Sequence, residues 1–257
     1  MEIQPKEKER IKSIDKSLNI LEFLSGYGQE IGIVEISEKL SMGFSTVHRI
    51  LNTLKSRGYV IQNQSTAKYR LGIKLFMLGS EAQSTKNLIR NIRPYLRELS
   101  KITNETVNLA ILEDKEVVYI DTIESSEFLR TDISKGTRLP AHSTALGKVL
   151  LAFLDNESLN CIYNKKEPFI SMTTKTISSY NQLVEELRIV KERGYATDFE
   201  EFKVGINCIS YPIFNANKEA IAAISLSGPA TRFTFDKIEE KKNILYIKSK
   251  QISKNLI

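Results

Sequence analysis

The chain has 257 residues, of which 41% are hydrophobic and 26% charged, an ordinary composition for a soluble globular protein. It is long enough for two modest domains and needs neither disulfides nor a metal ion to complete its core. No segment is apolar enough to cross a membrane, and residues 1–17 are too charged for a secretory signal peptide. The two cysteines, Cys161 and Cys208, form no disulfide framework, which predicts a cytoplasmic protein.

Positive charge is denser at the front of the chain. The net charge is +6 and the pI about 9.1. Residues 1–80 hold 12 basic and 8 acidic side chains, whereas the remaining residues hold 25 and 23. This asymmetry favours an anionic partner for the front, although many solvated surfaces are mildly basic.

Three short helices are predicted at the front, over about 13–24, 34–40 and 44–57. Ser13 stands where an N-cap would begin the first helix, and Gly26 and Gly28 follow its end. Val47, Ile50, Leu51 and Leu54 form a clean apolar stripe along the third helix.

The opposite face of the third helix is polar and rich in hydrogen-bond donors. Such a face suits the major groove of DNA, where Arg and Asn contact base edges and Ser and Thr contact phosphates. Taken alone, such a face is more often a solvated helix surface. The candidate DNA-binding residues are Ser45, Thr46, His48, Arg49 and Asn52, together with Lys68 in the following hairpin.

A hairpin follows the third helix. Two β-like runs, 59–61 and 68–71, flank the polar turn 62–66. A helix, then a helix-turn-helix, then a hairpin is the specific order of a winged helix-turn-helix.

These segments resemble a known family. The runs Ser17–Leu24, Val34–Leu40, Ser45–Val60 and Tyr69–Gly72 are similar to the DNA-binding domain of the IclR family of bacterial regulators. Phe44 departs from the family pattern, which has Lys or another polar residue there, so one DNA contact is lost or different.

The rest of the chain predicts an α+β domain. A connecting helix is expected over 73–88, and Pro94 is expected to open a helix over 95–102. Strands are predicted at 106–112, 117–123, 128–133, 206–214 and 220–226, and helices at 143–153, 179–193 and 236–254. We therefore expect a DNA-binding domain over 1–75, a linker helix over 76–90 and an antiparallel sheet domain with helices over 91–257.

Residues 139–148 are the most unusual stretch. A strand followed by a helix exposes backbone N–H groups that attract an anion such as a carboxylate, and Ser143 and Thr144 are natural caps. A capped, closely packed helix that binds nothing is the alternative.

The family resemblance extends over this half. It is carried by residues 106–110, 118–121, 136–148, 193–198, 205–209 and 223–229. The resemblance implies a GAF-like (profilin-like) domain that binds a small organic acid. It places the effector site at Ala145, Leu146, Asp198, Cys208, Ser225 and Ser227.

Other residues would complete the pocket implied by the resemblance. Leu139 and Thr131 would line its variable wall, and Thr131, Asp132 and Phe128 give it a rim of mixed polarity. Ser225 and Ser227 lie two apart on a strand and so share one face, where both can contact a single ligand.

The sequence gives only weak indications of an enzymatic site. His142, Ser143 and Asp198 could form a catalytic triad, but adjacent residues rarely act on each other and no nucleophile-elbow motif is present. Cys208 lies on a β-like run, where a small buried side chain is commoner than a reactive thiolate. The scattered histidines and cysteines predict no metal site, and no cofactor or catalytic residue is expected.

The predicted function is a transcription regulator, expected to be a repressor, whose affinity for a DNA operator depends on a small organic acid. The resemblance implies a homodimer or a dimer of dimers. Two alternatives stay open: a GAF-like metabolic enzyme with a vestigial DNA-binding front, and an architectural DNA-binding protein whose rear domain only oligomerises.

Overall fold

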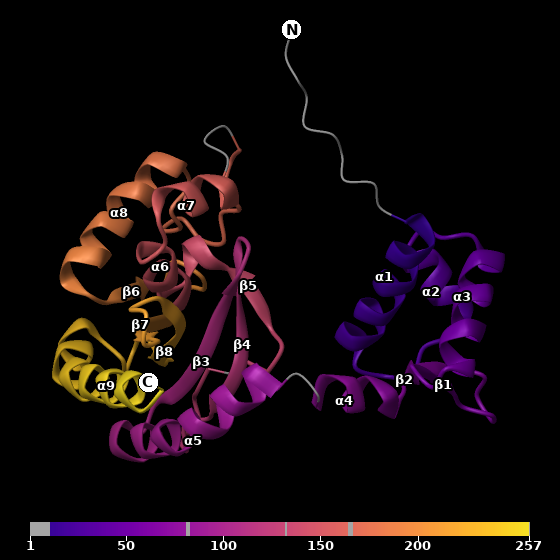
Figure 1. The fold of residues 1–257 in the computed structure, drawn as a ribbon, viewed down its shortest axis with the longest axis horizontal. Helices are drawn as coiled ribbons and strands as arrows, with labels where there is room; N and C mark the ends of the chain where they lie inside the picture. The colour runs from indigo at the N-terminus through magenta and orange to yellow at the C-terminus, as the bar shows by residue number, and fades with distance from the viewer. Residues whose placement is uncertain (1–10, 81–82, 132, 164–166, 257) are drawn as a thin grey trace, which may run out of the picture. The chain divides into compact units, whose positions relative to one another are not determined.

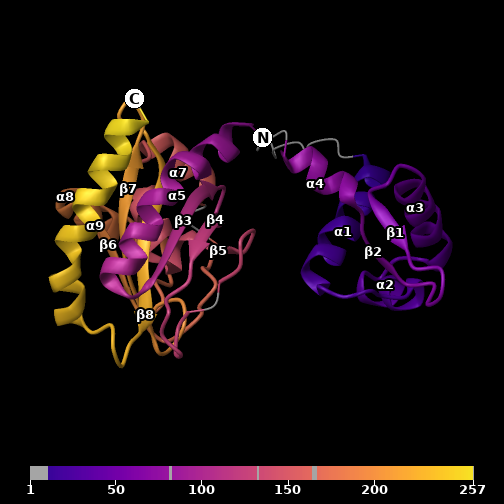
Figure 2. The ribbon, with the colours of Figure 1, turned by 90° about the horizontal axis from the view of Figure 1, so that it is seen from below.

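The computed structural model describes residues 11–80, 83–131, 133–163 and 167–256. Asp132, one of the expected rim residues, lies outside them. The chain divides between Gln83 and Ser84 into two compact units, shown in Figures 1 and 2. Of the helices that the structure describes, none combines the length and the apolar character needed to span a membrane.

The first unit is a winged helix-turn-helix. Strands β1 and β2 pair antiparallel, and β2 also forms an isolated bridge from Tyr69 to Ile31. Its elements are α1 (Lys12–Tyr27), α2 (Ile33–Lys39), α3 (Phe44–Ser56), β1 (Val60–Gln62), β2 (Tyr69–Leu71) and α4 (Ile73–Ser80).

The core of this unit is built from the predicted apolar stripe. Val47, Leu51 and Leu54 of α3 are buried against Ile20 of α1 and Ile36 of α2. The predicted cap of α1 was wrong. Ile11 is the N-cap and the helix begins at Lys12, so Ser13 lies inside its first turn. Gly28 ends the helix in the left-handed conformation that glycine accommodates best.

The second unit is an antiparallel sheet covered by helices on both faces. Its strands run in the order β5-β4-β3-β8-β7-β6. Its elements are α5 (Gln83–Thr103), β3 (Thr106–Glu113), β4 (Glu116–Ile123), β5 (Arg138–Pro140), the short 3₁₀ turn η1 (Ala141–Ser143), α6 (Ala145–Ala152), α7 (Asn156–Ile162), α8 (Tyr180–Arg193), β6 (Ala196–Phe199), β7 (Ile206–Phe214), β8 (Ala220–Pro229) and α9 (Phe235–Asn255).

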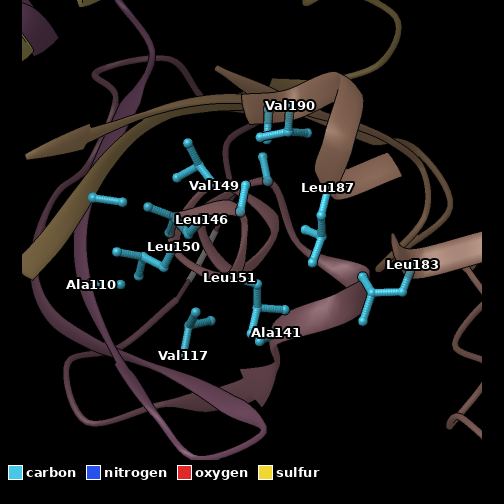
Figure 3. Packing of buried hydrophobic residues seen from close by; sticks show 14 of the residues in the cluster. Ala110, Val117, Ala141, Leu146, Val149, Leu150, Leu151, Leu183, Leu187 and Val190 are labelled. Carbon is cyan, nitrogen blue, oxygen red and sulfur yellow. The ribbon is translucent and has the colours of Figure 1, made fainter. Parts of the chain in front are cut away.

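Alternation along the strands separates two cores. One face packs on α5 and α9 through residues such as Leu109, Ile209 and Leu226. The other packs on α6 and α8, where apolar contacts surround a band of small polar residues described below. Figure 3 shows the apolar part of this second core, with Leu146, Val149, Leu150 and Leu151 of α6 lying among Leu183, Leu187 and Val190 of α8 and Ala110 and Val117 of the sheet.

Two predicted elements of this unit were wrong. Pro94 lies inside α5 rather than at the start of a helix, because Ile92, Leu96 and Leu99 bury one continuous apolar face that offsets the missing hydrogen bond. No strand forms over the described part of 128–133. The edge strand is Arg138–Pro140 instead, paired with β4.

Candidate functional site

The polar face of α3 is exposed as predicted. Ser45, His48, Arg49 and Asn52 are exposed and Thr46 is half-buried, whereas the apolar stripe points into the core. We refer to these five residues as the recognition face. The amide nitrogen of Asn52 lies 3.3 Å from a ring nitrogen of His48, so part of this face is already ordered.

Phe44 and the hairpin frame the recognition face on one side. The Phe44 ring is about half exposed and stacks on His48, with the ring planes 10° apart. Lys55 Nζ donates to Gln62 Oε1 at 2.9 Å, which joins α3 to the hairpin. The exposed Lys68 directly precedes β2.

A groove lies on the other side of the recognition face, between α1 and α3. It has a volume of about 540 Å³ and is lined by Lys12, Lys16 and Arg49, together with the polar Ser13, Ser17, Thr46 and Thr53 and the apolar Ile14 and Ile50. None of the three cations forms an ion pair with another described residue. Sequence analysis missed Lys12 and Lys16, although their i, i+4 spacing on α1 was a usable signal. Lys12 and Lys16 lie beside the recognition face, where two cations suit contact with a phosphate backbone.

The six residues expected to bind an effector come together in one cavity on the α6 face of the sheet. Ala145, Leu146, Asp198, Cys208, Ser225 and Ser227 all line it, joined by Tyr119, Ile133, Thr144, Phe202 and Ile206. We call this cavity the sheet pocket. Leu139 and Thr131, expected on its wall, are not among the lining residues, and Phe128 is fully exposed. The free volume is only about 10 Å³, the space of one water molecule.

The start of α6 forms one wall of the sheet pocket. Thr144 caps this helix, its Oγ1 accepting from Gly147 N at 3.0 Å, whereas Ser143 Oγ donates to the carbonyl of Pro140. Ala145 and Leu146 are the first two residues of α6, where backbone N–H groups have no acceptor within the helix. These two groups are suited to hold an anionic oxygen.

Asp198 supplies a carboxyl group to the pocket. Its Oδ1 accepts from the backbone N–H of Glu201 at 2.6 Å and more weakly from that of Phe202. Burial, and next the charge of Glu201, raise the pKa of Asp198 to about 7. Lys148 of α6 is buried beside it and binds Glu201 and Glu186 at 2.6 and 3.2 Å.

The residues of the alternative enzymatic sites are not arranged for catalysis. His142 Nε2 lies 3.0 Å from the carbonyl of Ile170, and the Ser143 hydroxyl is directed to Pro140. Asp198 is held by backbone N–H groups instead of by the histidine. Burial raises the pKa of the Cys208 thiol, which favours an inert thiol over a nucleophile. Within the described ranges, no three His, Cys, Asp or Glu residues lie where they could hold a metal ion.

A winged helix-turn-helix with a donor-rich recognition face, followed by a separate sheet unit with a buried pocket, defines a DNA-binding transcription regulator. Comparison with protein families identifies the family of regulators. Residues 13–64 match the IclR helix-turn-helix domain, and residues 80–254 match the C-terminal domain of IclR bacterial transcriptional regulators. The chain therefore belongs to the IclR family.

The chain is also similar to individual proteins that are named as transcription regulators. The HTH-type transcriptional regulator KdgR of Dickeya chrysanthemi is 41% identical over 248 residues, covering 96% of this chain and 81% of the relative. The transcriptional repressor IclR of Escherichia coli strain K12 is 32% identical over 233 residues, covering 90% and 85%. Because the relatives are named as transcription regulators, the chain is a regulator and not an enzyme.

A solved structure shares the fold over nearly the whole chain. It is an IclR homologue from Microbacterium hydrocarbonoxydans, in complex with 4-hydroxybenzoate, with a TM-score of 0.82. The match covers 95% of this chain and 98% of that one, at 21% identity.

Proposed function

We propose that this regulator is a repressor whose operator affinity is controlled by a small organic acid bound in the sheet pocket. The observation that carries the proposal is the convergence of six residues from α6, β6, β7 and β8 on one buried cavity. Three of the six, Asp198, Ser225 and Ser227, bring polar side chains to this cavity although each residue is at most 3% exposed.

The chemistry of the pocket favours an acid. The hydroxyls of Ser225 and Ser227 and the first N–H groups of α6 offer donors to a carboxylate. Asp198 offers a group that can accept from a ligand hydroxyl. An aromatic acid is bound by the Microbacterium homologue, which supports the class of ligand though not its identity in this chain.

The pocket must open to admit a ligand, and this conformational change offers a way to control DNA affinity. With about 10 Å³ free, an acid can enter only if α6 and the sheet or the segment around Phe202 move apart. A ligand that binds one arrangement better than another shifts the population between them, with a coupling of about 1–3 kcal/mol in typical cases.

Assembly and location complete the proposal. We infer a homodimer in the cytoplasm, or a dimer of dimers, in which two recognition faces occupy successive major grooves of a palindromic site. Exposed apolar side chains on α1 and α4 of the first unit support this pairing. They include Leu18, Ile73, Phe76 and Leu78.

Thermal denaturation against a panel of small carboxylic, sugar and aromatic acids, 4-hydroxybenzoate included, tests the effector site. Binding to the folded protein raises the unfolding midpoint, so a specific acid should stand out from the panel. Ser227→Ala should remove the shift, whereas Ser210→Ala should keep it, because Ser210 lies on the same sheet face but donates to the carbonyl of Ile224 and does not line the pocket.

DNA binding with and without the active acid completes the test. A specific acid that changes operator affinity in the wild type, but not in Ser227→Ala, supports the repressor proposal. If an acid binds without changing DNA affinity, control of the operator by that acid is contradicted. If no acid of the panel binds, the architectural alternative stands, in which the second unit serves assembly alone.

A further inference from the structure

The two pocket serines share one hydrogen-bonding partner that lies behind them. Asn108 of β3 is fully buried, and its Nδ2 donates to Ser225 Oγ at 3.2 Å and to Ser227 Oγ at 3.1 Å. The sheet register explains this contact, since Asn108 pairs directly with Ser225 on β8 and their side chains share a face. Asn108 itself does not line the pocket.

The amide of Asn108 is oriented from the opposite side. Asn108 pairs with Thr122 of β4, and Thr122 Oγ1 donates to Asn108 Oδ1 at 3.3 Å. The amide oxygen therefore points to Thr122 and both amide hydrogens remain for the serines. An Asn side chain has two N–H donors, and here each finds a hydroxyl.

The serine hydroxyls consequently face the pocket as donors. A hydroxyl carries one hydrogen and two lone pairs. Ser227 Oγ accepts from Asn108 and also from Cys208 Sγ at 3.2 Å, so only its hydrogen is left to use. Among the described residues, neither Ser225 nor Ser227 donates a hydrogen bond. Two buried hydroxyl hydrogens without an acceptor are costly unless a ligand supplies one.

We propose that Asn108 is a positioning residue that fixes Ser225 and Ser227 as donors and thereby makes the sheet pocket select ligands with an anionic oxygen at this end. The inference rests on the proposed effector site and deepens it. The selecting element is a residue behind the pocket that never touches the ligand. An amide ligand, which offers an NH₂ group in place of one carboxylate oxygen, would meet a donor instead of an acceptor.

The test measures acid-over-amide preference by calorimetry in the full-length protein. The probes are three matched pairs of increasing size: glycolate and glycolamide, gluconate and gluconamide, and 4-hydroxybenzoate and 4-hydroxybenzamide. The wild type should bind the acid of at least one pair about 10- to 100-fold more tightly than its amide. Asn108→Leu, which removes the donors without adding charge, should reduce this preference to within about threefold.

Asn108→Asp extends the test by inverting the polarity. At a pH high enough to ionise the introduced carboxyl group, whose pKa burial raises, that group only accepts, so both serines turn toward it and leave lone pairs facing the ligand. The preference should fall below that of Asn108→Leu. Asn207→Asp is the matched control, because Asn207 is also buried but donates to the carbonyl of Phe233 on the other side of the sheet. The control should keep the wild-type preference.

The outcomes separate this inference from the effector proposal. If the wild type prefers an acid and both Asn108 variants keep that preference, the positioning role is overturned and the effector site stands. If no acid of the three pairs binds the wild type, the effector site itself is contradicted.

A ligand-free measurement covers variants that fold poorly. Neutron diffraction of the deuterated wild-type protein should show the Asn108 amide deuterons directed at both serine oxygens. An amide oxygen directed at the serines would overturn the inference.

Discussion

At the scale of single residues, the same side-chain type serves different ends according to its surroundings. Ser45 is exposed on the recognition face, whereas Ser225 and Ser227 are buried with their oxygens already used by Asn108. Lys12 forms no ion pair with another described residue, but Lys148 is only 2% exposed and held between two carboxylates. Burial thus decides which partners a polar side chain can reach.

Arg49 is predicted to contact a base. Arg49→Ala should weaken operator binding by about 1–3 kcal/mol and leave binding to random DNA nearly unchanged, since a bidentate contact to guanine carries sequence information. Electrophoretic mobility shifts on both DNAs measure this. Arg57→Ala, which removes an exposed cation just beyond the end of α3, is the control. Equal weakening on both DNAs would assign Arg49 to a phosphate.

Asp198 is predicted to make folding stability depend on pH. Its pKa is about 7 in the folded protein against 3.8 ordinarily, so the folded state keeps a proton that the unfolded chain has lost between these values. The free energy of unfolding of the wild type, relative to Asp198→Asn, should therefore fall as pH rises from about 4 to about 7. The total change is on the order of 4 kcal/mol.

Urea denaturation of both proteins at a series of pH values measures this difference. Above pH 7 and below pH 4 the difference should level off, because Asp198 then has the same protonation in both states. A difference that is constant between pH 4 and 7 would show an ordinary carboxyl group.

At the scale of elements, the packing of α1 against α3 determines what lies beside the recognition face. Packing of Ile20 against Val47 and Leu51 brings the exposed flank of α1 beside the recognition face and creates the α1–α3 groove. The hairpin borders the recognition face on its other side, through the contact of Lys55 with Gln62. The recognition face therefore has basic groups on both flanks, as a helix between two phosphate backbones needs.

The α1–α3 groove is predicted to hold DNA phosphates. Exchanging both Lys12 and Lys16 for Gln should weaken binding to operator and random DNA alike. The slope of log K against log salt concentration should become shallower by about 2, since each lost phosphate contact removes about one released counterion. Lys39→Gln, at the end of α2 and outside the groove, should leave the slope unchanged. An unchanged slope in the double variant would remove the groove from the DNA interface.

At the scale of the whole molecule, exposed apolar side chains of the first unit indicate an interface. The first unit exposes apolar side chains on α1 and α4, with Phe76 72% exposed. Scattered exposed apolar residues are normal, but their concentration on two helices of one small unit is typical of an interface. A second copy of this chain is the partner that the proposed palindromic operator would require.

Phe76 is predicted to stabilise the dimer. Phe76→Ser should raise the dimer dissociation constant at least about tenfold, because each copy would lose the burial of a large apolar side chain. Phe128→Ser is the control, since Phe128 is fully exposed in the second unit. Sedimentation equilibrium of both variants measures the constant. A dimer weakened by neither change, or equally by both, would place the interface elsewhere.

Periodicity and local chemistry determined most elements of the fold from the sequence alone. The apolar stripe of α3, the hairpin and the strand that carries Ser225 and Ser227 all follow from spacings of 3.6 or 2 residues. The family resemblance added the six pocket residues, which the structure brings together. The predictions for Pro94 and for the described part of 128–133 were wrong, because burial of a continuous helix face and pairing of Arg138–Pro140 with β4 outweighed local preference.

Only the tertiary structure decided which distant residues meet. No local pattern places Asn108 behind Ser225 and Ser227, 117 and 119 residues away, because strand order and register bring them together. The raised pKa of Asp198, the nearly closed pocket and the groove between α1 and α3 also depend on packing between separate segments. The sequence by itself determined the class of protein and its chemical groups, since these are written in local residue types. Their polarity, charge and accessibility were decided by burial, which is a property of the folded chain.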